Sequence, residues 1–133
     1  MNRSETRELA FKLLYQIEIQ KEISKEDIIL FFENNNINDK QAQEYIEDVI
    51  YGINKEAKAI ISTISKNLKE DWEIERVSKV NMALLKLGIY EIVYKKLPFK
   101  VVINEVVELA KKYGEETSKV FINGILASVV KES

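Results

Sequence analysis

Residues 97–130, LPFKVVINEVVELAKKYGEETSKVFINGILASVV, decide the fold that we expect for this chain of 133 residues. Pro98 blocks the continuation of any preceding helix, and apolar residues recur at helical spacing after it. Gly114 suits a left-handed helix C-cap, and Glu116 or Thr117 can begin another helix. The stretch therefore predicts two helices joined by a short turn.

The remainder of the chain also reads as helices. The whole sequence contains one proline and four glycines, so few positions break a helix. Apolar spacing predicts helices over about 4–20, from 25 to about 34, from 40 to about 68 and over about 78–96. A kink or split at Gly52 is the alternative for the third of these helices. A short helical turn is expected around Trp72. We therefore expect an all-α fold whose central element is the nearly all-apolar helix over 78–96.

Composition excludes most enzyme chemistry. The chain contains no cysteine and no histidine, which removes thiolate and imidazole nucleophiles, Cys/His zinc sites and Ser-His-Asp triads. Glu105 and Glu108 have ordinary i, i+3 helical spacing, and no nucleophile or phosphate-binding loop accompanies them. We therefore predict a chain that is not an enzyme and that uses no cofactor and no metal.

Charge and hydropathy bound the partners and the location. The formal net charge is -2 with 32% charged residues, so any nucleic-acid site must be a local patch rather than a global basic field. We recognise neither a signal peptide nor a stretch of apolar residues long enough to span a bilayer. The sequence predicts one cytoplasmic domain over residues 1–133.

The C-terminal half carries a set of motifs that resembles the NusB family. In that family a proline loop leads into a helix reading Ile-Asn-Glu-x-x-Glu-Leu-Ala-Lys, followed by an aromatic-Gly turn and a helix reading Phe-x-Asn-Gly-x-Leu. The matching residues here are Pro98, Ile103 to Glu105, Glu108 to Lys111, Tyr113-Gly114 and Phe121 to Leu126. Residues 85–91 are also similar to a family segment, with Lys86 in place of an arginine.

The resemblance implies a fold and a function. It implies a compact bundle of about seven helices, with an N-terminal three-helix portion packed on a C-terminal helical portion. It also implies a transcription antitermination factor that binds boxA-type single-stranded RNA together with NusE and supports rRNA transcription by contacting RNA polymerase with other Nus factors. A homodimer is possible. The alternatives are a helical protein-interaction module without RNA binding, or the appendage of an rRNA methyltransferase.

The N-terminal helix offers the first candidate RNA contacts. Arg3 and Arg7 are one turn apart on the same helical face, and Tyr15 continues that slowly drifting stripe. Basic side chains neutralise phosphates, and an aromatic ring stacks on unpaired bases. A solvated charged face beside core aromatics explains the pattern equally. By resemblance this stretch touches RNA, although Ser4 and Glu5 stand where strongly basic family members have arginines.

The C-terminal helices offer the second set of candidates. By resemblance, Lys100 and Lys119 lie near the RNA-binding surface, while ordinary solvation is the alternative. Phe121 flanks the apolar stripe of the last helix, so it either completes the core or presents a stacking face. Gly124 is explained by a close approach between helices. Glu91 lies within the apolar central helix, where a carboxylate needs a partner, for which we expect a cation such as Arg76 or helix-end amides.

Overall fold

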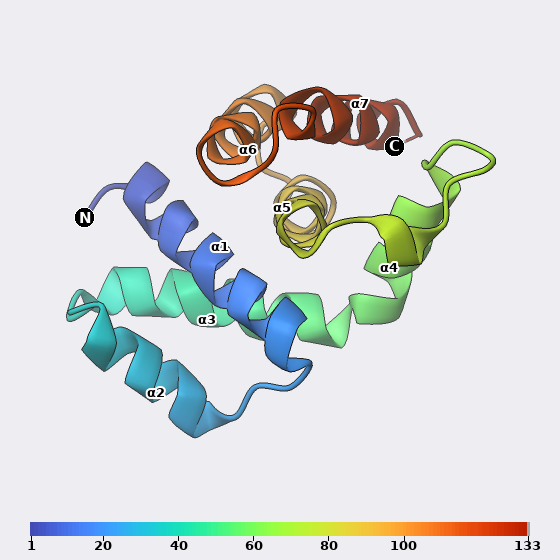
Figure 1. Cartoon of the computed structure of the whole chain (residues 1–133). Coiled ribbons are helices and arrows are strands. Elements are labelled where there is room, and N and C mark those ends of the chain that lie inside the picture. The colour runs from blue at the N-terminus through green and yellow to red at the C-terminus, as the bar shows by residue number, and fades with distance from the viewer. Residues whose placement is uncertain (133) are drawn as a thin grey trace.

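The computed structural model describes residues 1–132, in which seven α-helices form the fold (Figure 1). The helices are α1 (Arg3–Gln20), α2 (Lys25–Asn34), α3 (Lys40–Lys55), α4 (Ala57–Lys66), α5 (Lys79–Ile89), α6 (Phe99–Tyr113) and α7 (Ser118–Glu132). A 3-10 turn, η1 (Ile74–Arg76), precedes α5, and a π-helical segment, η2 (Tyr90–Tyr94), follows it. No strand occurs in the described part of the chain, so the all-α prediction is confirmed.

Polar side chains fix where four of the helices begin. Asn2 and Ser24 each accept from the backbone N–H three residues later, and the acidic side chain at that position accepts from the cap residue's own N–H. Asp39 and Ser78 cap α3 and α5 by accepting a backbone N–H through their side chains, without a reciprocal hydrogen bond. These caps satisfy amide groups that a helix leaves unpaired, each stabilising the helix by about 1 kcal/mol.

Helix α5 is the centre of the molecule. Figure 1 shows it nearly end-on, with α6 and α7 above it and with α1 crossing α3 on the other side. It contacts α1, α4, α6 and α7, and its Leu84, Leu85 and Leu87 are fully buried in one core that all seven α-helices share. The predicted arrangement, an N-terminal three-helix portion against a C-terminal portion, is confirmed.

Three local predictions need correction. The chain from residue 40 divides at Glu56, between α3 and α4, and not at Gly52. Gly52 lies inside α3, and close packing explains the glycine, since a Cβ there would be 2.1 Å from the Tyr90 hydroxyl oxygen. The helix expected over 78–96 changes to π-helical hydrogen bonding at Tyr90. Gly114 is extended, with φ -91° and ψ -174°, so the left-handed cap expected there is wrong.

Gly114 has a steric reason of a different kind. A Cβ on this residue would lie 2.6 Å from the Ser118 side chain and 2.8 Å from the carbonyl oxygen of Ala110. The glycine is therefore required by the tight packing of the turn between α6 and α7. The two helices of the opening stretch are present as predicted on either side of it.

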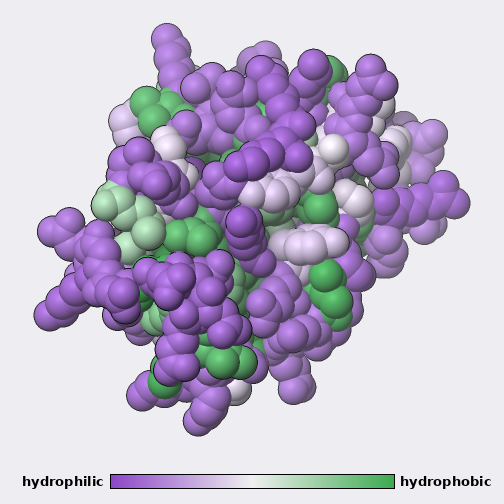
Figure 2. Space-filling view, turned by 60° about the vertical axis from the view of Figure 1, so that its left-hand side comes forward, coloured by the Kyte–Doolittle hydropathy of each residue, from purple (hydrophilic) through white to green (hydrophobic). Residues whose placement is uncertain are grey.

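Hydrophilic side chains cover most of the face shown in Figure 2, and apolar atoms appear there in separate patches. No helix in residues 1–132 is long and apolar enough to cross a bilayer. Candidate sites must therefore be sought in local grooves and clusters of this surface.

Candidate functional site

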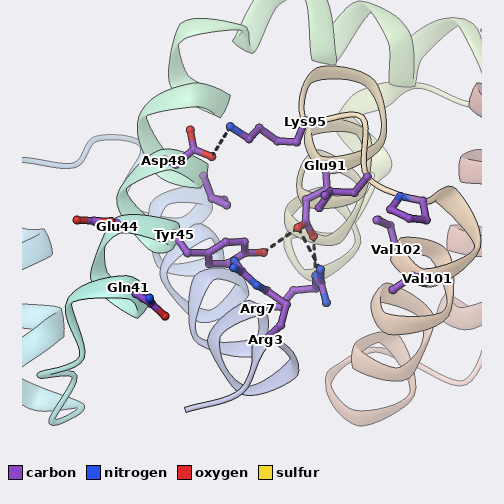
Figure 3. A pocket seen from close by; sticks show the side chains of 13 residues that line it. Arg3, Arg7, Gln41, Glu44, Tyr45, Asp48, Glu91, Lys95, Val101 and Val102 are labelled. Carbon is purple, nitrogen blue, oxygen red and sulfur yellow. Dashed lines mark hydrogen bonds and ion pairs between the residues drawn. The ribbon is translucent and has the colours of Figure 1, made fainter.

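A buried ionic network joins the N-terminal helix to the C-terminal half (Figure 3). The Arg7 side chain donates to both carboxylate oxygens of Glu91, from Nε at 2.6 Å and from Nη2 at 3.2 Å. Its Nη1 donates to Glu105 at 3.0 Å, and the Tyr45 hydroxyl donates to Glu91 at 3.0 Å. Arg7 is 3% exposed and Glu91 is 1% exposed. The network therefore links α1, α3, η2 and α6 from inside the protein.

The network corrects the partner expected for Glu91. Arg76 lies in η1 and is exposed, whereas the cation paired with Glu91 is Arg7, which comes 84 residues earlier in the chain. Burial lowers the pKa of Arg7, but the hydrogen bond and charge of Glu91 outweigh it, so the pKa is raised overall. Burial, followed by the negative charge of Glu91, raises the pKa of the Tyr45 hydroxyl. Arg7 stays charged and Tyr45 neutral at physiological pH.

Arg3 occupies a different environment from Arg7, although the two are one helical turn apart. Its side chain is exposed, and its guanidinium carbon lies 4.2 Å from the centre of the Tyr45 ring. The exposed pair of arginines expected from the sequence is therefore not formed, because the carboxylates of η2 and α6 take Arg7 into the interior. Of the two, Arg3 alone faces solvent.

A groove of about 690 Å³ opens beside these residues, which we call the α1–α3 groove. Its walls are the start of α1, the outer side of α3 and the proline loop. Its lining consists of Arg3, Arg7, Gln41, Glu44, Tyr45, Asp48, Val49, Glu91, Lys95, Leu97, Pro98, Val101 and Val102. Figure 3 shows Lys95 reaching across to Asp48, with which it pairs at 3.2 Å. The groove thus combines apolar walls with charges of both signs.

Tyr15 lies farther along α1 and is half-buried. Its ring stacks on Phe11, with centroids 6.3 Å apart, and Phe11 in turn lies 5.1 Å from the ring of Tyr113 in α6. Tyr113 and Lys112 also hold Glu8 of α1 by hydrogen bonds, which lower the pKa of the Glu8 carboxyl. The aromatic row therefore helps to join α1 to α6, and its two ends, Tyr15 and Tyr113, are both half-buried.

The three C-terminal candidates fall on two sides of α7. Lys100 lies in a shallow pocket with Asn123, and Lys119 is one helical turn before Asn123 and exposed. Phe121 is two residues after Lys119, which places it about 160° away around the helix axis. It stacks on Trp72, with centroids 5.6 Å apart, at a second groove. The structure therefore brings Lys100 and Lys119 to one surface and separates Phe121 from them.

Two residues at these surfaces were not predicted as site residues. Tyr45 contacts partners 42 and 46 residues away along the sequence, which helical periodicity does not reveal. Trp72 is 48% exposed, which is unusual for so large an apolar side chain. The explanation expected for Gly124 is wrong, since a Cβ there would meet nothing within 4 Å. Among residues 1–132, no group of histidine, cysteine, aspartate and glutamate side chains could hold a metal ion.

Comparison with known proteins gives a consistent result. A profile of the NusB family matches residues 4–131. The chain is 47% identical over 132 residues to the transcription antitermination protein NusB of Acetivibrio thermocellus, covering 98% of this chain and 90% of that protein. It is 42% identical over 134 residues to the protein of the same name in Clostridium acetobutylicum, covering 100% of this chain and 98% of that one.

Solved structures agree with the sequence relatives. NusB of T. maritima is 35% identical with a TM-score of 0.88, over 99% of this chain and 92% of that one. A NusB chain solved with NusE in complex with dsRNA is 30% identical with a TM-score of 0.88 and covers both chains completely. From the sequence motifs, the helical arrangement and these matches together, we conclude that the chain belongs to the NusB family.

Proposed function

We propose that this protein is a non-enzymatic transcription antitermination factor that binds boxA-type single-stranded RNA together with NusE. The observation that carries the proposal is the full-length match to a NusB chain that was solved with NusE in complex with dsRNA, while the single-stranded boxA-type substrate rests on the family resemblance. The antitermination names of its relatives favour this function over a protein-interaction module or a methyltransferase appendage. We further propose that the assembly contacts RNA polymerase with other Nus factors, and that a homodimer forms in the absence of partners.

The proposed RNA contacts are Arg3, Tyr15, Lys100, Lys119 and Phe121. Because they lie on different faces, the strand would follow the surface from the start of α1, across α6, to α7, an order of helices that Figure 1 displays. Arg7 was predicted with them, but its donors already hold Glu91 and Glu105, so we propose an indirect role for it. NusE would compensate for the modest basic patch by sharing the RNA.

Binding of labelled RNA across a salt series tests the proposal. A boxA-like strand, a scrambled strand and a duplex of the boxA-like sequence are compared with and without NusE. We expect selective binding of the boxA-like strand that strengthens with NusE. Equal affinity for all three RNAs in both conditions would contradict the function, and a preference for the duplex would contradict the single-stranded substrate.

Lysine variants test the proposed C-terminal contacts. Replacing Lys100 and Lys119 together with alanine should lower the magnitude of the salt slope by about 1.4, because each lost phosphate contact on single-stranded RNA contributes about 0.7. Lys58→Ala is the matched control, since Lys58 is an exposed lysine on α4. An unchanged slope in the double variant would remove these lysines from the RNA surface.

A further inference from the structure

The Arg3 side chain is held in place while its donors remain available. Within residues 1–132 no ion pair of Arg3 is present, and its guanidinium carbon lies 4.2 Å from the centre of the Tyr45 ring. The N–H groups of a guanidinium lie in its plane, so contact of one face with a ring leaves these donors free at the edges. This is the arrangement that two N–H groups need to bind a phosphate together.

Tyr45 is itself fixed by the buried network. Its hydroxyl donates to Glu91, and Glu91 is held by two donors of Arg7. Arg7 lies one turn after Arg3 on α1. The same helix therefore carries Arg3, which contacts the Tyr45 ring, and Arg7, which holds the Glu91 carboxylate to which Tyr45 donates. Figure 3 shows the Tyr45 ring beside Arg3, with its hydroxyl turned toward Glu91. The ring therefore has a defined position relative to the start of α1.

The residues around Arg3 fix its backbone. Asn2 and Glu5 form the reciprocal cap that begins α1, and the Ser4 hydroxyl donates to Glu105 of α6. Ser4 and Glu5 thus anchor this end of the helix. With Arg7 buried, Arg3 is the arginine of this segment that can reach a phosphate.

We propose that Tyr45 is a positioning residue for RNA binding, which orders the Arg3 guanidinium for a phosphate without touching the RNA itself. The inference rests on the proposed function. Ordering a long side chain on binding has an entropic cost, and a side chain already ordered in the free protein avoids it. Removing the ring should therefore weaken RNA binding by about two- to tenfold through Arg3 alone. Glu44 in the α1–α3 groove repels phosphate, whereas Asp48 is paired with Lys95, so we expect the strand to approach Arg3 from the side away from Glu44.

A double-mutant cycle on the whole protein tests the inference. RNA affinity and salt slope are measured by fluorescence anisotropy for the wild type, Arg3→Ala, Tyr45→Leu and the double variant, with NusE present. Tyr45→Phe is the matched comparison, because it keeps the ring beside Arg3 and removes only the hydroxyl that holds the ring to Glu91. Urea unfolding of each variant, followed by circular dichroism, gives the folded fraction by which affinity is corrected.

The expected result is non-additive. Tyr45→Leu should weaken binding about two- to tenfold in the Arg3 background and have no effect once Arg3 is alanine. Tyr45→Phe should lose less affinity than Tyr45→Leu, because its ring remains although the hydrogen bond to Glu91 is gone. An equal loss from Tyr45→Leu in both backgrounds would overturn the inference and leave the proposed function standing. If the wild type binds no RNA with or without NusE, both the function and the inference are wrong.

Discussion

The buried Arg7–Glu91 pair makes a strong prediction about stability. Replacing Arg7 with methionine keeps much of the apolar volume of the side chain but removes the cation that faces Glu91, which is 1% exposed. The Tyr45 hydroxyl is then the remaining donor to that carboxylate. Breaking a buried ion pair from one side typically costs about 3–5 kcal/mol, because the other charge stays buried without compensation.

That loss is large against the whole stability of such a protein. Domains of this size have free energies of unfolding of about 5–15 kcal/mol, so a loss of about 3–5 kcal/mol from Arg7→Met should remove roughly a fifth of the stability or more. The assay is urea unfolding at 25 °C followed by far-UV circular dichroism. The unfolding midpoint should fall while the slope with denaturant stays constant, as for a variant that changes stability without changing the surface exposed.

Two further variants serve as controls for the stability prediction on Arg7→Met. Arg3→Met is the same chemical change one turn earlier on α1, where the lost contact of an exposed guanidinium with the half-buried Tyr45 ring is worth about 0.5–1 kcal/mol. Adding Glu91→Gln to Arg7→Met removes the stranded charge and should restore part of the loss. If Arg7→Met costs no more than Arg3→Met, or if Glu91→Gln restores nothing, the reasoning from the buried pair is refuted.

Three further predictions concern glycines and titrating groups. Gly52→Ala should destabilise the fold by about 1–3 kcal/mol, since its Cβ would be 2.1 Å from the Tyr90 hydroxyl oxygen. Gly124→Ala should stabilise the fold by up to about 1 kcal/mol, because its Cβ would meet nothing within 4 Å. Urea unfolding measures both variants, and equal effects on the free energy of unfolding would contradict both predictions. Burial raises the pKa of the Tyr90 hydroxyl to about 12 and raises the pKa of the Tyr45 hydroxyl as well. The stabilisation that comes from keeping both hydroxyls neutral is therefore present below pH 10 and is lost as the pH rises through their folded-state pKa values. Absorbance titration should show two late-ionising tyrosines in the wild type and one fewer in each of Tyr45→Phe and Tyr90→Phe. Hydrogen bonds from Lys112 and Tyr113 lower the pKa of the Glu8 carboxyl, so its contribution to stability is present above the unfolded-state pKa and is lost as the pH falls through the lower folded-state pKa. Glu8→Gln should therefore make the stability depend less steeply on pH in the acid range. An unchanged dependence would contradict the role of these hydrogen bonds.

Much of the fold followed from local sequence signals. The two helices after Pro98 and the buried central helix were predicted because apolar spacing and proline chemistry act over a few residues. The conformation of Gly114 was predicted wrongly, since glycine also serves close packing, and the sequence does not distinguish that use from a left-handed cap. The alternative break at Gly52 was wrong for the same reason, because this glycine makes room for Tyr90 from a distant segment and does not end the helix.

The candidate site could be predicted only in part. Arg3 and Arg7 share a helical face by periodicity, but which of them is buried depends on Glu91 and Glu105, which the fold brings from the other half of the chain. Lys100 and Lys119 were expected near one surface from the family resemblance, whereas helical periodicity alone does not bring them together, because their proximity depends on how α6 packs on α7. The sequence therefore identified residue types suited to RNA, and the tertiary contacts decide how each of them is presented.

The π-helical segment η2 imposes a constraint on the length of the chain. The N–H of Lys95 donates to the carbonyl of Tyr90, five residues earlier, so this turn holds one residue more than an α-helical turn. Each residue of an α-helix turns the chain by about 100° around the helix axis. Deleting one residue from this segment would therefore rotate the side chains that follow the deletion by about 100° relative to the side chains that precede it. Glu91 and the proline loop would then lose their common alignment. The length of this segment is therefore constrained in addition to the identity of its buried residues, Tyr90 and Glu91.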